Sequence, residues 1–218
     1  MLKTRINLIA SLVDKCNIVL DIGSDHAKIS KILIDENKAN RVINVELNEG
    51  PLQNSIKATN HAKYYNHIWN IKSNGFKEIY PSFFIDVCII AGMGGQTIVE
   101  ILNESKSHKV NQFILQANNN VEKIRDWCFK NNWRIKNECF VKDNDIIYEI
   151  LVISKKKGYI PFCFNRKYFG KINLKLKNEL FIERWSDELK YLKRNENLYK
   201  KNIKIISKIE KILKNKNL

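Results

Sequence analysis

Two carboxylates and a glycine follow the first apolar run of the sequence in an arrangement that suits ligand binding. Residues 21–27 read DIGSDHA and begin where the run 17–20 ends. Phosphate-binding turns use G-x-G-x-x-G or a glycine-rich loop ending in Gly-Lys-Ser/Thr. This turn has a single glycine, and its two carboxylates would repel pyrophosphate. A cationic ligand with an amino-acid head group fits better, because Asp21 can face its ammonium group and Gly23 lets the backbone come close.

Further polar residues stand where later apolar runs end. Glu46 lies 25 residues after Asp21, where an acidic residue binds the ribose hydroxyls in dinucleotide folds. Asn74 could accept a hydrogen bond from an adenine amino group, although an ordinary Asn-Gly turn with Gly75 explains it equally well. The candidate residues for an adenosyl ligand that carries a sulfonium are Asp21, Gly23, Ser24, Asp25, His26, Glu46, Leu47, Asn74, Gly75, Ala91 and Gly92.

The segment 89–97, IIAGMGGQT, holds three glycines within four residues. Such a cluster costs conformational entropy, and a tight turn alone needs only one or two glycines. We therefore expect a reacting group to approach the backbone here. The amides of Gln116 and Asn118 could read a base edge, although solvated loop amides are an equal alternative. The candidate residues of the reaction centre are Gly92, Met93, Gly94, Gln116 and Asn118. No metal-ligand set stands out.

Apolar runs alternate with helix-like stretches along the first two thirds of the chain. The runs are 17–22, 41–46, 65–71, 85–91 and 112–117. A helix is expected at 3–13, and the others near 26–37, 51–61, 95–105 and 120–132, with Asp25 as the N-cap of a helix that begins at His26. The alternation predicts an α/β fold with a parallel sheet covered on both faces. Two final strand-like runs, joined at 143–145, predict a closing antiparallel hairpin, which is typical of methyltransferase sheets.

The positive charge is concentrated at the end of the chain. The net charge is +15, yet residues 1–154 hold 19 basic and 17 acidic residues, whereas 155–218 hold 19 basic and 6 acidic ones. Codon bias in an AT-rich genome would raise lysine throughout the chain. The uneven distribution favours a tail that faces a polyanion.

The basic tail predicts a second, helical domain. Residues 155–171 contain two glycines and a proline and read as a linker or irregular crossing. Apolar spacing predicts helices at 174–194 and 198–213 with a turn at 195–197, which together form a coiled-coil-like hairpin with a basic outer face. We expect a catalytic domain at 1–155 and a helical domain at 156–218. The hairpin can close on itself, so we expect a monomer.

Composition also indicates the compartment. The chain has no run of about 18 apolar residues that could span a membrane, and its first 16 residues read as an amphipathic helix rather than a signal peptide. The five cysteines are odd in number and form no C-x-x-C pair. Reduced thiols in a cytoplasmic protein are therefore expected.

The order of these motifs resembles that of the bacterial tRNA (adenine-22-N1)-methyltransferases. The shared segments are DIGSDHA, NEGP after Glu46, IIAGMGG, ILQ-x-N, VEKIRDW and YEIL, and the match is close over 5–154 and loose over the tail. The resemblance implies a Rossmann-like class I fold with a C-terminal coiled-coil-like domain. It also implies S-adenosyl-L-methionine as methyl donor, and tRNA methylated at N1 of an adenine in the D-arm region.

Three positions depart from the family pattern. Asn74 stands where the family usually has Asp, Ala117 where it has Pro, and Lys28-Ile29-Ser30 where it has Tyr-Leu-Pro. Asn can still accept from the adenine amino group, whereas Ala117 is expected to loosen the loop that frames the target base.

The residues also leave other functions open. One is a methyltransferase for another RNA position or acceptor, which would leave the tail charge without a purpose. Another is a dinucleotide-dependent oxidoreductase, disfavoured by the missing second and third glycines. The third is a non-catalytic RNA-binding protein on the same fold. For the methyltransferase, N1 of adenine has a free lone pair, so positioning rather than a strong base is expected to drive the reaction. A stacked or paired adenine must open or flip first.

Overall fold

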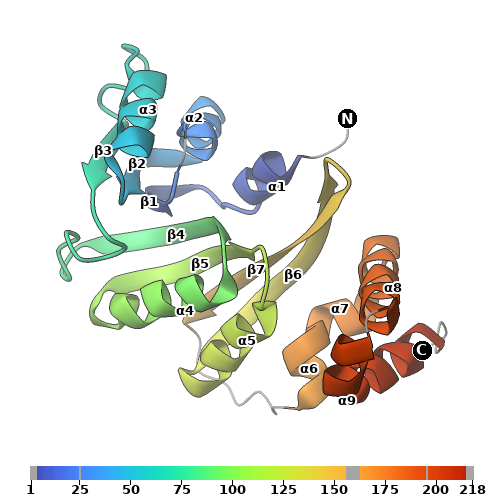
Figure 1. Ribbon diagram of the computed structural model, residues 1–218. Helices are drawn as coiled ribbons and strands as arrows, with labels where there is room; N and C mark the ends of the chain where they lie inside the picture. The colour runs from blue at the N-terminus through green and yellow to red at the C-terminus, as the bar shows by residue number, and fades with distance from the viewer. Residues whose placement is uncertain (1–3, 25, 156–162, 195, 215–218) are drawn as a thin grey trace.

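A twisted sheet forms the centre of the molecule (Figure 1). The computed structural model describes residues 4–24, 26–155, 163–194 and 196–214. Within them, seven strands pair in the order β3-β2-β1-β4-β5-β7-β6. They are β1 (Cys16–Ile22), β2 (Ala39–Glu46), β3 (Ile68–Lys72), β4 (Phe84–Met93), β5 (Lys109–Ala117), β6 (Trp133–Asp143) and β7 (Ile146–Lys155). Strands β1 to β5 pair in parallel, and β7 is antiparallel to both neighbours. The predicted Rossmann-like fold is confirmed.

Helices cover both faces of the sheet because successive strand residues point to opposite sides. In β1, Val19 packs with residues of α1 (Arg5–Ser11) and α2 (Lys28–Asp35). The adjacent Leu20 packs instead with residues of α4 (Gly95–Glu104) and α5 (Val121–Lys130). The remaining elements of this part are α3 (Glu49–Thr59) and a short 3-10 helix, η1 (Ser105–Ser107).

The last two strands form the predicted hairpin. Asn144 and Asp145, at its tip, have φ angles of 48° and 62°. Positive φ at both central residues matches the right-handed twist of paired strands, and Asn and Asp tolerate this conformation. The tip lies at the same end of the sheet as α1, since the backbone N–H of Arg5 donates to Oδ2 of Asp143 at 2.9 Å.

The C-terminal helices gather beside the β6–β7 edge of the sheet, drawn in orange to red in Figure 1. They are α6 (Phe164–Phe169), α7 (Lys171–Leu176), α8 (Glu179–Arg194) and α9 (Glu196–Lys214). A separate apolar cluster joins Phe140 of β6 to Phe169, Trp185 and Ile209 of these helices. No helix in the described ranges has the length and apolar character needed to cross a membrane.

Two expectations for the tail are corrected. Residues 164–169 are helical rather than irregular, and 156–162 lie outside the described residues. The single helix at 174–194 is wrong, because Lys177 takes a left-handed φ of 41° and ends α7. Oδ1 of Asn178 then accepts from the backbone N–H of Phe181 at 2.9 Å, which caps α8.

The boundaries of two other helices also differ from those expected. The helix after β1 begins at Lys28 instead of His26, and Ala27, with a left-handed φ of 50°, occupies the N-cap position without a side-chain cap. The predicted N-cap role of Asp25 is therefore wrong, and Asp25 itself lies outside the described residues. Helix α9 already includes residues 196–197 of the predicted turn, and it is kinked at Asn202 (φ −114°, ψ 16°).

Candidate active site

A cavity of about 350 Å³ lies at the carboxyl ends of the first parallel strands. These ends meet at one edge of the sheet, where ligands of open α/β sheets bind. Five predicted ligand residues and one predicted reaction-centre residue line the cavity: Gly23, Glu46, Leu47, Asn74, Gly75 and Met93. Thr97, Glu100 and Glu104 of α4 complete one wall. No motif predicted these three, although their spacing of three and four residues on a helix could have indicated a shared face.

Glu46 is held in place by the first turn of the site. Its side chain is almost buried, and its Oε1 accepts a hydrogen bond from Oγ of Ser24 at 2.9 Å. The backbone N–H of Gly23 also donates to the carbonyl oxygen of Val45 at 2.9 Å. The turn after β1 is thus tied to the end of β2. Ser24 orients Glu46 and does not itself line the cavity.

One oxygen of the buried Asp21 carboxylate, Oδ2, has no hydrogen-bond partner among the described residues. The residue is 2% exposed. Burial, followed by the negative charge of Glu46, raises the pKa of Asp21 to about 7, while a hydrogen bond with Ser30 acts in the opposite direction. A buried anion without a partner is costly, and a cationic group nearby would relieve the cost. Asp21 does not line the cavity itself, whereas the next two residues, Ile22 and Gly23, do.

The turn after β1 touches the turn after β4. Gly23 has a φ of +77°, and a Cβ built on it would lie 2.5 Å from Cε of Met93. A side chain there would be strained and would also displace Met93 from the cavity wall. Because Gly23 has no side chain, its backbone lies directly beside the cavity. Together with the unpaired oxygen of Asp21 and the acidic end of β2, it fits an adenosyl ligand with a cationic amino-acid part.

A second cavity, of about 420 Å³, lies on the other side of the glycine-rich turn. It is lined by Arg5 of α1, the β5–α5 loop 117–122, the start of β7, Tyr168 of α6, and Arg184 and Trp185 of α8. The turn contacts this loop directly, because the backbone N–H of Gly95 donates to the carbonyl of Asn119 at 3.0 Å. A Cβ on Gly95 would overlap the carbonyl oxygen of Asn120. The turn 92–95 therefore separates the two cavities.

The predicted reaction-centre amides brace this turn. Gln116 is 0% exposed, and its Oε1 accepts from the backbone N–H of Gly92 at 3.1 Å and from Nη1 of Arg5 at 2.9 Å. Its Nε2 donates to Oδ1 of Asn118 at 3.1 Å, and Nδ2 of Asn118 donates to the carbonyl of Gly92 at 2.8 Å. Both hydrogen bonds to Oε1 of Gln116 come from the protein. Asn118, which lines the second cavity, is the amide within reach of a ligand.

Arg5 is the residue of this network that no sequence motif predicted. It lies 111 positions before Gln116, and its guanidinium carbon is 4.8 Å from the centre of the Tyr148 ring. An isolated arginine in an amphipathic helix carries no local signal of such a role. Tyr148, in β7, stands on the wall of the second cavity.

The positions at which this chain departs from the family pattern lie in different surroundings. Asn74 lines the first cavity, as an adenine-binding residue should. Ser30 donates through Oγ to Oδ1 of Asn44, and Nδ2 of Asn44 donates to Oγ of Ser55 at 3.1 Å, inside a buried polar cluster. Ala117 is buried at the end of β5. Its predicted effect on the following loop stays a prediction.

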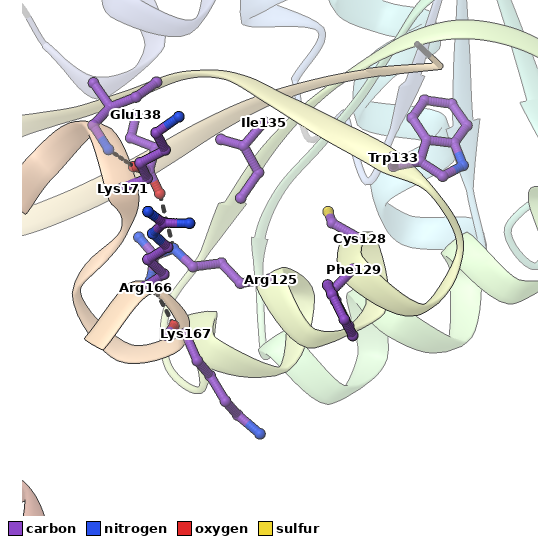
Figure 2. Close-up of a pocket in the computed structure, with 10 residues that line it drawn as sticks. Arg125, Cys128, Phe129, Trp133, Ile135, Glu138, Arg166, Lys167 and Lys171 are labelled. Atoms are coloured by element: carbon purple, nitrogen blue, oxygen red, sulfur yellow. Dashed lines mark hydrogen bonds and ion pairs between the residues drawn. The ribbon is translucent and has the colours of Figure 1, made fainter. Parts of the chain in front are cut away.

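A buried ion-pair cluster joins the sheet to the tail (Figure 2). Nε of Arg125, in α5, donates to Oε1 of Glu138 at 2.9 Å, and its Nη2 pairs with Glu149. Nη1 of Arg125 also donates to the carbonyl of Tyr168 at 3.1 Å, and Oε2 of Glu138 accepts from the backbone N–H of Ile172 at 2.7 Å. The cluster thus binds the end of α6 and the start of α7. A cavity of only about 70 Å³ lies beside it, between Arg125, Cys128 and Trp133.

The fold and the site together define a class of enzyme. The sheet is parallel except for one antiparallel strand next to its edge, and an adenosyl-sized cavity lies at the ends of β1, β2 and β4. Both features are typical of a class I methyltransferase. A family model described as tRNA (adenine(22)-N(1))-methyltransferase matches residues 19–216. The chain belongs to this family, which confirms the resemblance predicted from its motifs.

Named relatives agree with this membership. The tRNA (adenine(22)-N(1))-methyltransferase of Bacillus subtilis is 26% identical over 196 residues, which cover 87% of this chain and 82% of that protein. Streptococcus pneumoniae Sp1610, in complex with S-adenosyl-L-methionine, is 30% identical with a TM-score of 0.89, covering 98% of this chain and all of that one. TrmK of M. capricolum, in complex with S-adenosyl-homocysteine, is 30% identical with a TM-score of 0.84, covering 98% of both chains.

Proposed function

We propose that this chain transfers a methyl group from S-adenosyl-L-methionine to N1 of adenine 22 in the D-arm region of tRNA, the reaction of its family. The observation that carries the proposal is the pair of cavities on either side of the turn 92–95. The first has the polar groups of an adenosyl site. The second is open to a nucleotide and is lined by Asn119, whose carbonyl accepts a hydrogen bond from the backbone N–H of Gly95 in the same turn.

The first cavity binds the methyl donor. Glu46 accepts hydrogen bonds from the ribose hydroxyls, and Asn74 accepts one from the adenine amino group. The ammonium group of the donor approaches the turn after β1, where its charge compensates the buried carboxylate of Asp21. Gly23 and Met93 shape the wall beside the methionine part.

The reaction needs positioning rather than a general base. When bound, the donor supplies a methyl group on a positively charged sulfur. The lone pair of N1 forms the new bond as the carbon–sulfur bond breaks, so the positive charge moves to the adenine. The hydrogen bonds of Gln116 and Asn118 hold the Gly92 turn, and Asn118 faces the acceptor side. Holding the two reactants in line supplies most of the rate enhancement.

The helical domain at 156–218 binds the tRNA backbone. The protein acts as a monomer. Lys201, Lys204 and Lys211 are exposed on α9, and cationic side chains bind phosphate groups without sequence preference. Selectivity for the nucleotide then comes from the shape of the RNA. A reducing cytoplasm is the compartment that suits a tRNA substrate and five free cysteines.

Transfer of radiolabel from S-adenosyl-L-methionine to unmodified tRNA transcripts tests the proposal. We expect label in a transcript with adenine at position 22 and none in the same transcript with guanine there. If neither transcript is labelled while calorimetry shows donor binding, the assignment of adenine 22 as the acceptor is wrong. Absence of donor binding would contradict the assignment of the first cavity.

A further inference from the structure

The second cavity has an arginine from each end of the chain on its wall. Arg5 comes from α1 and Arg184 from α8, and the aromatic side chains of Tyr148, Tyr168 and Trp185 lie on the same wall. Its volume of about 420 Å³ falls within the range of sites that hold small organic ligands. Cationic and aromatic groups together are typical of sites for single-stranded nucleic acid.

Arg5 is fixed by three contacts. Its backbone N–H donates to Asp143, Nη1 donates to Gln116, and its guanidinium lies 4.8 Å from the centre of the Tyr148 ring. Guanidinium has five N–H donors. Within the described part of the chain, its side chain makes one hydrogen bond, to Gln116. The remaining donors can meet a ligand in the cavity.

Arg184 supplies the second positive charge. Its Nη1 donates to Oε2 of Glu188 at 2.9 Å, and its guanidinium carbon lies 5.6 Å from the centre of the Trp185 ring. The side chain is 40% exposed, so its planar face and other donors remain accessible. An arginine guanidinium matches the geometry of a phosphate group and can bind two of its oxygens at once.

We propose that the RNA strand carrying the target adenine enters this second cavity, and that Arg5 and Arg184 bind the backbone phosphate groups that flank the adenine. This inference rests on the proposed function. Arg5 also bonds to Gln116, which bonds to Gly92. A phosphate on Arg5 would therefore be connected through two side chains to the turn that borders the donor cavity. The arrangement would set the distance between the RNA strand and the methyl group.

Arg5 could instead serve only to brace Gln116, and salt dependence separates the two roles. A phosphate contact contributes close to one unit to the slope of log binding constant against log salt concentration. We expect Arg5→Gln and Arg184→Gln each to reduce this slope for unmodified tRNA by about 0.7 to 0.9. Arg5→Lys keeps the charge and should keep the slope.

Arg41 provides a matched control. Its guanidinium lies 5.1 Å from the centre of the Trp69 ring, and it stands near the start of β2, away from the carboxyl end of the strand. Arg41→Gln should leave the slope unchanged, and Arg184→Gln and Arg41→Gln should both bind S-adenosyl-L-methionine with wild-type affinity. A wild-type slope in both Arg5→Gln and Arg184→Gln would overturn the inference. Failure of the wild-type protein to bind donor or tRNA would instead contradict the proposed function.

Discussion

Nε of Arg125 lies 2.9 Å from Oε1 of Glu138, although these two side chains are only 2% and 0% exposed. Glu149 pairs with the same guanidinium, so one buried cation compensates two carboxylates. The pairs connect α5 with β6 and β7, and their remaining hydrogen bonds extend to α6 and α7. The junction between sheet and tail is therefore a specific polar cluster in addition to an apolar contact.

Removal of this cation should destabilise the whole chain. Arg125→Met leaves two carboxylates buried without compensation, and we expect the free energy of unfolding to fall by about 3–5 kcal/mol. Urea denaturation monitored by circular dichroism measures this loss. Arg134→Met, at an exposed position of β6, should change it by less than about 0.5 kcal/mol. Equal stability of the two variants would show that the cluster makes no net contribution to the free energy of unfolding.

The pKa of Asp21 predicts an unusual dependence of stability on pH. The pKa is raised from 3.8 to about 7, so between these values the native state binds a proton that the unfolded state has released. The free energy of unfolding should therefore fall as pH rises through this window, by at most about 1.4 kcal/mol per pH unit. Asp21→Asn removes the effect. Urea denaturation at about pH 5 and about pH 8 should give a stability difference between the two proteins that grows with pH. A stability difference that does not change with pH would contradict the raised pKa of Asp21.

Donor binding should depend on the same proton. The ammonium group of S-adenosyl-L-methionine favours the ionised form of Asp21, so the apparent affinity should rise between about pH 6 and about pH 8. Calorimetry in buffers of different ionisation enthalpy should detect release of a proton on binding near the lower pH. Asp21→Asn should bind weakly at both pH values without proton release. An Asp21→Asn variant that binds as tightly as the wild type would exclude a role of this carboxylate.

A methyl group at Gly23 should close the donor cavity. Gly23→Ala combines a φ of +77° with a contact of 2.5 Å to Cε of Met93, and we expect donor affinity to fall about tenfold or more. Gly50→Ala is the control, since a Cβ at Gly50 meets no atom within 4 Å and Gly50 lies in α3. Calorimetric titration with S-adenosyl-L-methionine compares them. Similar affinities would show that the turn can shift without cost.

Charge on α9 should control tRNA affinity and leave the donor site alone. The combined change Lys201→Glu, Lys204→Glu and Lys211→Glu is expected to weaken tRNA binding about tenfold or more at low salt. Reversal of the exposed Lys15, Lys106 and Lys109 changes the net charge equally, at the start of β1 and β5. Filter binding compares both sets, with donor affinity as the folding control. Equal losses would indicate a general charge effect and contradict a role for the tail.

Local sequence patterns were sufficient to predict the strands and to group several candidate donor residues at one edge of the sheet. β-branched runs alternate with amphipathic stretches, which predicts the parallel sheet, and the hairpin signal at 143–145 predicts its antiparallel strand. Residues that follow such strands must meet at one edge of the sheet. For this reason Gly23, Glu46 and Asn74 could be grouped without coordinates.

Only the tertiary structure decided which distant residues complete the site and hold the tail. Arg5 meets Gln116 across 111 positions, and Arg125 meets Glu138 and Glu149 because α5 packs beside the closing hairpin. The break at Lys177 depends on one left-handed residue, which apolar spacing does not reveal. Periodicity and turn chemistry are local properties of the chain and can be read from it. Contacts between elements depend on how side chains pack in three dimensions, and no short segment carries that information.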